Sequence, residues 1–201
     1  MRIKKKDDFP VSRWDGGTTT ELFLYPESGS YIERNFQVRL SSAVIEKEES
    51  DFTLLPGVHR FLLMQKGSVR LRFGNGREIQ LPPLNVFEFD GDVPVHCFGS
   101  GTDLNLMLKG GARGELACRT IPPKTEVQLP KGSSTGRSVY VIEGSINASG
   151  KTPCSPRHTD PVYPGLPVRR GELILTDREE TLYLSNLEAI PAVIAVFSFT
   201  I

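Results

Sequence analysis

Long apolar runs are missing from this sequence, and so is an excess of charge of either sign. No stretch approaches the about 18 apolar residues of a membrane span, and the basic start is not followed by the apolar run of a secretion signal. Lys plus Arg and Asp plus Glu both number 24, so no long-range positive field would hold nucleic acid or an anionic membrane. We therefore expect a cytoplasmic protein with neither nucleic acid nor a membrane as its partner.

Cysteine and histidine are also scarce, with three of each. The cysteines are widely spaced without a Cys-x-x-Cys pair, which fits reduced thiols in the cytosol. No His-x-His pair is present; a split site of His59, His96 and a carboxylate such as Glu88 is geometrically open, but we expect no metal. The Gly-x-Ser-x-Gly elbow, the Walker loop and the dinucleotide fingerprint are absent too. We therefore expect no cofactor, and we assign no catalytic residue.

What the sequence does contain is a series of short runs rich in Val, Ile, Leu and Phe, set between clusters of Gly, Pro, Asn and Asp. Helical periodicity is hard to find, and this pattern is typical of β-sandwiches and barrels. The clearest signal lies in residues 58–81, where two alternating strands flank Asn75-Gly76, a pair that suits a type I′ turn. We predict a nearly all-β chain with a hairpin at 69–81.

The second half repeats the order of the first half more faintly. Gly67-Ser68-Val69 recurs at Gly144-Ser145-Ile146, and the second half is longer by a stretch that carries five prolines. Coincidence is the alternative, because any all-β chain offers such steps. The sequence predicts an N-terminal lobe of residues 1–110 and a C-terminal lobe of residues 111–201. Within the C-terminal lobe, residues 151–168 are expected to form an exposed insertion.

The segment richest in potential ligand contacts is residues 13–22, RWDGGTTTEL. Its two glycines allow the backbone to approach a ligand or another strand closely, and its three threonines supply hydrogen-bond donors and acceptors. The alternative is a Gly-Gly turn that leads into a Thr-rich strand, since threonine favours strands in any case. The sequence leaves both interpretations open.

Two further segments place polar side chains on strands. In residues 36–43, strand alternation puts Arg39 and Ser41 on one face, where a guanidinium among hydroxyls could bind a carboxylate through two parallel hydrogen bonds. An outward-facing arginine is the alternative. In residues 103–107, Asn105 lies between apolar neighbours and shares the face of Asp103, so that face is either a polar interior or wet.

These segments, together with FTLLPGVHR at residues 52–60, resemble the HutD/Ves family in content, order and spacing. Four such motifs in order cover about residues 9–110. The departures are Trp14-Asp15 where many members have an asparagine, Val38 where they have a tryptophan before the arginine, and His59 where they often have an acidic residue. The residues that match the family motifs are Thr19, Glu21, Arg39, Ser41, Arg60 and Asn105.

The resemblance implies a bicupin, two jelly-roll lobes of the RmlC-like cupin type, and a small carboxylate ligand from histidine utilisation, such as urocanate or a formylated glutamate, bound in a regulatory role. Our first hypothesis is a metal-free pocket that binds a small carboxylate, with Arg39 as the anion contact. A metal-independent isomerase or lyase using His59 or Glu21 as general base is the second. A scaffold with a vestigial pocket is the third. The expected ligand-binding residues are Trp14, Gly16, Gly17, Thr18, Thr19, Glu21, Arg39, Ser41, His59, Arg60 and Asn105.

Overall fold

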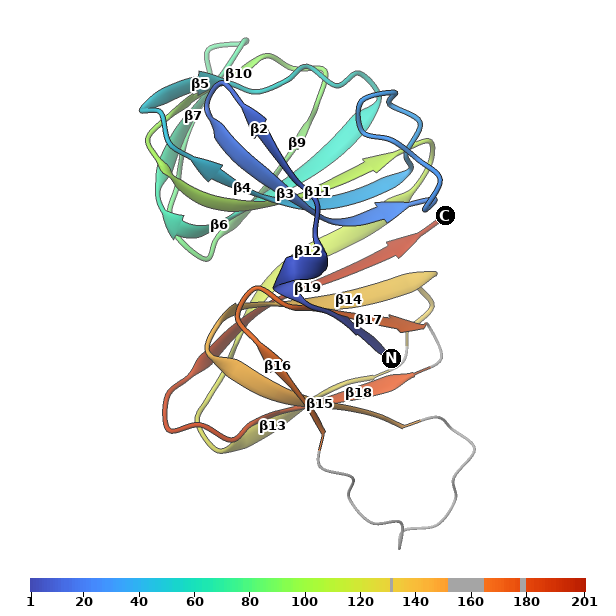
Figure 1. The fold of residues 1–201 in the computed structure, drawn as a ribbon. Helices are drawn as coiled ribbons and strands as arrows, with labels where there is room; N and C mark the ends of the chain where they lie inside the picture. The colour runs from blue at the N-terminus through green and yellow to red at the C-terminus, as the bar shows by residue number, and fades with distance from the viewer. Residues whose placement is uncertain (131, 152–164, 178–179) are drawn as a thin grey trace, which may run out of the picture. The chain divides into compact units, whose positions relative to one another are not determined.

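The computed structural model describes residues 1–130, 132–151, 165–177 and 180–201. Their regular structure is β-strand apart from one 3-10 turn, η1 (Lys6–Asp8), so the all-β prediction is confirmed. The chain divides into two compact units (Figure 1). One consists of residues 9–116, and the other consists of residues 117–200 together with residues 1–8. Here they are called the N-terminal unit and the C-terminal unit.

The N-terminal unit is built from two antiparallel sheets rather than one closed barrel. The six-stranded sheet has the order β2 (Val11–Trp14), β3 (Gly17–Tyr25), β4 (Val38–Ile45), β11 (Gly101–Lys109), β6 (Val58–Gly67), β9 (Val86–Asp90). The four-stranded sheet has the order β5 (Glu49–Asp51), β10 (Val95–Phe98), β7 (Val69–Phe73), β8 (Glu78–Leu81). The predicted hairpin forms from β7 and β8, with Val69 opposite Leu81. The expected type I′ turn is wrong, because Gly76 has a positive φ of 83° and Asn75 does not; the Gly76 amide instead donates to the Phe73 carbonyl in a longer loop.

The C-terminal unit also has two sheets. The five-stranded sheet has the order β1 (Arg2–Lys4), β17 (Leu173–Asp177), β14 (Gly136–Glu143), β19 (Ala192–Thr200), β12 (Arg113–Ile121). The four-stranded sheet has the order β13 (Thr125–Leu129), β18 (Thr181–Asn186), β15 (Ser145–Lys151), β16 (Leu166–Arg169).

The bounds of the units differ from those of the predicted lobes. Residues 1–8 group with the C-terminal unit because β1 pairs with β17, with Ile3 opposite Ile174. The division also falls after Leu116 rather than after residue 110. Most of the expected insertion, residues 152–164, lies outside the described residues.

Eight strands follow the same order in both units. The order β4-β11-β6-β9 with β5-β10-β7-β8 in one corresponds to β12-β19-β14-β17 with β13-β18-β15-β16 in the other. Gly67 and Gly144, which have the same φ of 77°, link the equivalent strand pairs β6–β7 and β14–β15. The pairing of β6 with β11 and the pairing of β14 with β19 shift register at the same place. The pair Arg60 and Met107 therefore corresponds to the pair Arg137 and Ser198. A repeat of one lobe in the other, as the sequence suggests, requires such a shared strand order.

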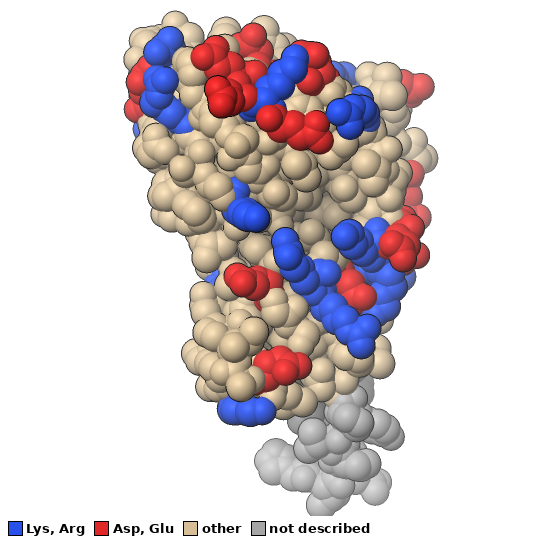
Figure 2. All heavy atoms as spheres, turned by 60° about the vertical axis from the view of Figure 1, so that its left-hand side comes forward, with Lys and Arg blue, Asp and Glu red and all other residues tan. Residues whose placement is uncertain are grey.

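Two apolar clusters fill much of the N-terminal unit. One surrounds Leu62 and Leu71, and the other consists of Phe36, Leu55, Val58 and Met107 with their neighbours. The surface mixes both signs of charge, as Figure 2 shows for one face, where acidic and basic side chains are interspersed. Among the described residues, no helix is long and apolar enough to cross a membrane.

Candidate ligand-binding site

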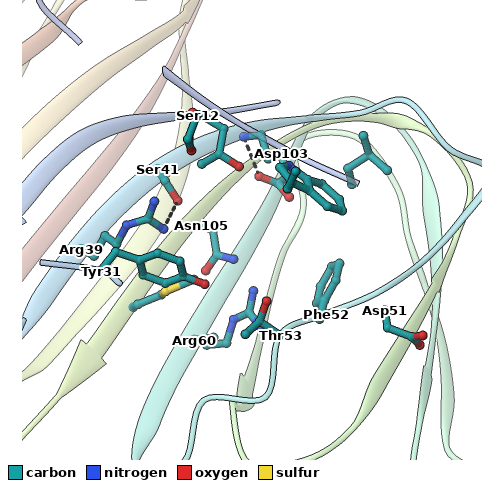
Figure 3. Close-up of a pocket in the computed structure, with 15 residues that line it drawn as sticks. Ser12, Tyr31, Arg39, Ser41, Asp51, Phe52, Thr53, Arg60, Asp103 and Asn105 are labelled. Atoms are coloured by element: carbon teal, nitrogen blue, oxygen red, sulfur yellow. Dashed lines mark hydrogen bonds between the residues drawn. The ribbon is translucent and has the colours of Figure 1, made fainter. Parts of the chain in front are cut away.

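A cavity of about 190 Å³ opens in the N-terminal unit (Figure 3). Its lining comes from β2, β3, β4, β6 and β11, together with Tyr31 and residues 51–53. Pockets for drug-sized ligands usually measure about 300–1,000 Å³, so this cavity suits a smaller molecule.

The cavity floor follows β11, which lies between β4 and β6. Alternate residues of a strand face the same side, so Asp103, Asn105 and Met107 all point into the cavity. The register sets a partner on β4 and on β6 beside each: Ala43 and Met64 beside Asp103, Ser41 and Leu62 beside Asn105, Arg39 and Arg60 beside Met107. The two arginines therefore flank one residue, at the opposite end of the row from Asp103.

Arg39 is buried and is held by protein groups on two sides. Its Nε donates to Glu21 Oε2 at 2.8 Å, and Nη1 donates to Ser41 Oγ at 3.0 Å. The ring of Tyr31 lies 4.0 Å from the guanidinium carbon, within the range of a cation–π contact. The charge of Arg39 is thus largely compensated before any ligand binds.

Arg60 is equally buried, at 5% exposure, but lacks such partners. Its Nε is buried without a hydrogen bond, and no hydrogen bond or ion pair of its guanidinium is found among the residues that the structure describes. The guanidinium carbon lies 5.0 Å from the ring centres of both Phe52 and Phe89. Burial lowers the pKa of Arg60 to about 10, against the opposing effect of Asp103. The side chain remains a cation at neutral pH, and no described carboxylate lies in contact with it.

Three further polar groups in the lining have unused hydrogen-bonding capacity. Asp103 is 4% exposed; its Oδ1 accepts from the Ala43 amide at 3.1 Å, and Oδ2 accepts no hydrogen bond within the described part of the chain. Asn105 Oδ1 and Trp14 Nε1 are buried and have no hydrogen-bond partner among the described residues. Native proteins satisfy most buried polar groups, so a cluster of unpaired ones marks a place where a ligand or water supplies the partners. Figure 3 shows Arg39 and Arg60 pointing toward the space beside the Asn105 amide.

The carboxyl of Asp103 is also electrostatically unusual. Burial raises its pKa to about 7, and the amide of Ala43 and the two arginines only partly oppose that shift. The carboxyl of Asp103 therefore gains and loses its proton near neutral pH. The neighbouring Cys97 behaves differently, because burial raises the pKa of its thiol to about 12 and removes it as a nucleophile.

The equivalent face of the C-terminal unit lacks most of these groups. Ile194 and Val196 stand at the positions that correspond to Asp103 and Asn105. Arg137, which corresponds to Arg60, donates to the backbone carbonyls of Pro130 and Glu180. The fold therefore does not need an acid and an amide at these positions, nor an arginine without acceptors.

The glycine pair beside the cavity supports its wall. A Cβ on Gly16 would lie 2.0 Å from the ring of Trp14, which lines the cavity, and one on Gly17 would lie 1.9 Å from the Val44 carbonyl oxygen. Gly16 thus gives the indole its place, and Gly17 allows β3 and β4 to approach each other closely.

The expected binding residues divide into two groups. Those that line the cavity are Trp14, Thr19, Arg39, Ser41, Arg60 and Asn105. Gly16 and Gly17 lie behind the lining, Thr18 is outside it, and Glu21 contacts Arg39 from outside it. His59 is also outside, because its Nδ1 lies 2.8 Å from Asp90 Oδ1.

Several lining residues were missing from the expected set. Asp103 could have been included by alternation, because it shares the face of Asn105. Tyr31 and Phe52 reach the cavity from segments between strands, where no periodic signal indicates direction.

A family model named HutD matches residues 6–162. The chain belongs to the HutD family. Its structure is similar to that of a conserved protein of unknown function from Pseudomonas aeruginosa PAO1, with 21% identity, a TM-score of 0.79 and coverage of 100% of this chain and 98% of that chain. HutD from Pseudomonas fluorescens SBW25, in a formate condition, follows at 17% identity and a TM-score of 0.73, with 99% of this chain and 97% of that chain covered.

The formate complex of Lactobacillus farciminis oxalate decarboxylase is more distant, with 9% identity, a TM-score of 0.71 and coverage of 98% of this chain and 85% of that chain. No curated protein matches the HutD-family chain. At these identities the similarities to solved structures concern the fold alone. With the two-sheet units, they confirm the cupin fold class expected from the sequence.

A resident metal does not fit the cavity of this HutD-family chain. Mn(II) centres are named for oxalate decarboxylase of Bacillus subtilis, which has 10% identity and a TM-score of 0.69, with 98% of this chain and 76% of that chain covered. Here the lining offers two guanidiniums, the carboxylate of Asp103 beside an amide, and Asp51, whose exposed carboxylate is held by His96; neither His59 nor His96 lines the cavity. Guanidiniums repel a divalent cation and cannot bind it as ligands. The described residues contain no group of three or more His, Cys, Asp or Glu side chains placed to hold a metal.

Proposed function

We propose that the cavity of the N-terminal unit binds a small carboxylate metabolite, with Arg60 as its main anion contact. The observation that carries the proposal is a buried guanidinium without a hydrogen bond or ion pair among the described residues. Arg39, which the sequence suggested as the anion contact, is the second arginine of the site and is positioned by Glu21.

The physical reason is the cost of leaving a charge buried and unpaired. A buried cation is stable when an anion accepts its hydrogen bonds, and a carboxylate matches the planar fork of a guanidinium. Tyr31 and Thr53 place hydroxyl groups in the same lining. Because Glu21 already compensates Arg39, the charge of Arg60 is the one left for a ligand, and a monoanionic carboxylate matches it.

Two further points support the proposal. The names of two similar structures mention formate, for HutD from Pseudomonas fluorescens and for oxalate decarboxylase from Lactobacillus farciminis. The resemblance in sequence suggests a regulator of histidine utilisation, so urocanate and a formylated glutamate belong in any ligand screen. We also place the protein in the cytoplasm as a bicupin, a location that fits its free thiols at Cys97 and Cys118.

Thermal-shift and calorimetric titration against formate, acetate and larger carboxylates test the proposal. A ligand at 100 times its dissociation constant stabilises the protein by about 2.7 kcal/mol. We expect Arg60→Met to abolish this gain and Arg60→Lys to restore little of it, because an ammonium lacks the two-pronged geometry. Arg113→Met, which removes an exposed arginine at the start of β12, is the matched control. Undiminished binding by Arg60→Met would remove Arg60 from the site.

A second candidate is a metal-independent enzyme that acts in the same cavity. One observation favours it, namely the inward-facing Asp103 whose pKa burial raises to about 7, a value suited to a general acid or base. His59 does not line the cavity, and Glu21 is paired with Arg39. Incubating a bound carboxylate with equimolar protein and following it by NMR separates the two functions. A sensor returns the ligand unchanged, whereas an enzyme converts it in the wild type and not in Asp103→Asn.

A further inference from the structure

We propose that Asp103 selects ligands that carry a hydrogen-bond donor at the end opposite their carboxylate. The inference rests on the proposed function and deepens it, because it names a class of ligand: a compact acid with an N–H or ammonium group at its far end.

The two ends of the cavity differ in chemistry. Asp103 and Met107 are four residues apart on β11, which corresponds to roughly 13 Å along a strand. Both arginines stand beside Met107, and their long side chains reach back toward Asn105 (Figure 3). A bound molecule with its carboxylate on Arg60 therefore extends past Asn105 toward Asp103.

Asp103 has one oxygen available for that molecule. Oδ1 accepts from the Ala43 amide, whereas Oδ2 has no donor in the described residues and the side chain is 4% exposed. The two flanking side chains, Ala43 and Met64, cannot donate a hydrogen bond to Oδ2. A donor from the ligand would complete the hydrogen bonding of the carboxylate and favour its ionised form.

The C-terminal unit shows that this acid has no necessary structural role. Ile194, at the equivalent position, is fully buried, so an apolar residue is compatible with the same strand pairing. Retaining an acid in an apolar layer is costly unless something pairs with it. Because Asp103 lines the cavity, a ligand can supply the donor that its Oδ2 lacks among the described residues.

A matched pair of ligands tests the inference on the wild-type protein. The probes are 3-(1H-pyrrol-3-yl)propanoate and 3-(furan-3-yl)propanoate, which have nearly the same shape but exchange a ring N–H donor for an oxygen acceptor. Calorimetry at pH 8.5, above the raised pKa of Asp103, should give about tenfold to a hundredfold tighter binding of the pyrrole. In Asp103→Asn the ratio should fall to about threefold or less, since a neutral amide offers both a donor and an acceptor.

Each result decides something separate. Equal affinities for both probes would overturn the proposed preference for a donor and leave carboxylate binding intact. Tighter binding of the furan would do the same, because it would show that Asp103 is protonated and donates the hydrogen bond. Binding of formate and propanoate but of neither probe would show that the cavity ends before Asp103 and would also overturn it. Failure of all four acids would refute the proposed function itself.

Discussion

Replacing Arg60 by methionine should not destabilise the ligand-free protein, although Arg60 is among its most deeply buried charges. Burial lowers the pKa of Arg60 from 12.5 to about 10. One pKa unit corresponds to about 1.4 kcal/mol, so the cation costs the folded state about 3 kcal/mol at pH 7, where it is charged in both states. Contacts with the rings of Phe52 and Phe89 at 5.0 Å offset about 1–2 kcal/mol of this.

Methionine keeps the apolar contact with both rings and removes the charge. We expect the free energy of unfolding of Arg60→Met, measured in urea at pH 7 without ligand, to stay unchanged or to rise by about 1–2 kcal/mol. Arg39→Met is the matched comparison in the same row. It should lose about 2–4 kcal/mol, because it leaves Glu21 and Ser41 without their partner.

The opposite signs of the two effects are the critical result. If Arg60→Met lost as much stability as Arg39→Met, Arg60 would have a structural partner, and the case for an empty anion site would fail. Arg137→Met extends the comparison to the C-terminal unit, where the equivalent arginine donates to two carbonyls and its loss should destabilise. A neutral outcome there would show that these acceptors contribute little.

Three other predictions follow from the site. Burial raises the pKa of Asp103 to about 7, above the 3.8 of an exposed aspartate, and the charged or titratable groups that face its carboxyl are Arg39, Arg60 and Cys97. The folded state therefore loses stability as pH rises from about 4 to 7. In urea unfolding, the stability of Asp103→Asn relative to the wild type should increase across that range and stay constant above it. Gly16→Ala should displace the ring of Trp14, the single tryptophan, changing its fluorescence and weakening carboxylate binding, whereas Gly132→Ala should do neither. Mn²⁺ or Zn²⁺ should leave the melting temperature unchanged, and elemental analysis should find less than one metal per chain; one equivalent lost on mutating His59 or His96 would contradict this.

The strand pattern of the sequence was sufficient for the all-β class and for part of the site, whereas the cupin type came from the family resemblance. Alternation places Arg39 with Ser41, and Asp103 with Asn105, on shared faces, and both pairs line the cavity. The same rule also excludes His59 once Arg60 is assigned inward, because successive residues of a strand point to opposite faces. The hairpin at 69–81 could be predicted because its turn chemistry is local.

The roles of the two arginines could not be read from the sequence, because they depend on which strands are neighbours. Glu21 reaches Arg39 through a register shift between Glu21 and Phe23, and a bulge of this kind leaves little trace in the sequence. The isolation of Arg60 depends on β6 lying beyond β11, so that Met107 rather than an acid separates it from Arg39. Tyr31 is placed by a loop, which periodicity does not describe.

An anion site built this way links stability to ligand concentration. Arg60 has no ion-pair partner among the described residues, so its charge makes the ligand-free N-terminal unit less stable than an apolar equivalent. On the proposed function, a bound carboxylate would reverse that penalty by giving the cation an acceptor. The link favours a sensor over a scaffold, because a scaffold gains nothing from a charge that destabilises it. It also predicts where variation is tolerated: a change that removes the charge preserves the fold and abolishes the response, whereas a change in Glu21 or Ser41 disturbs both.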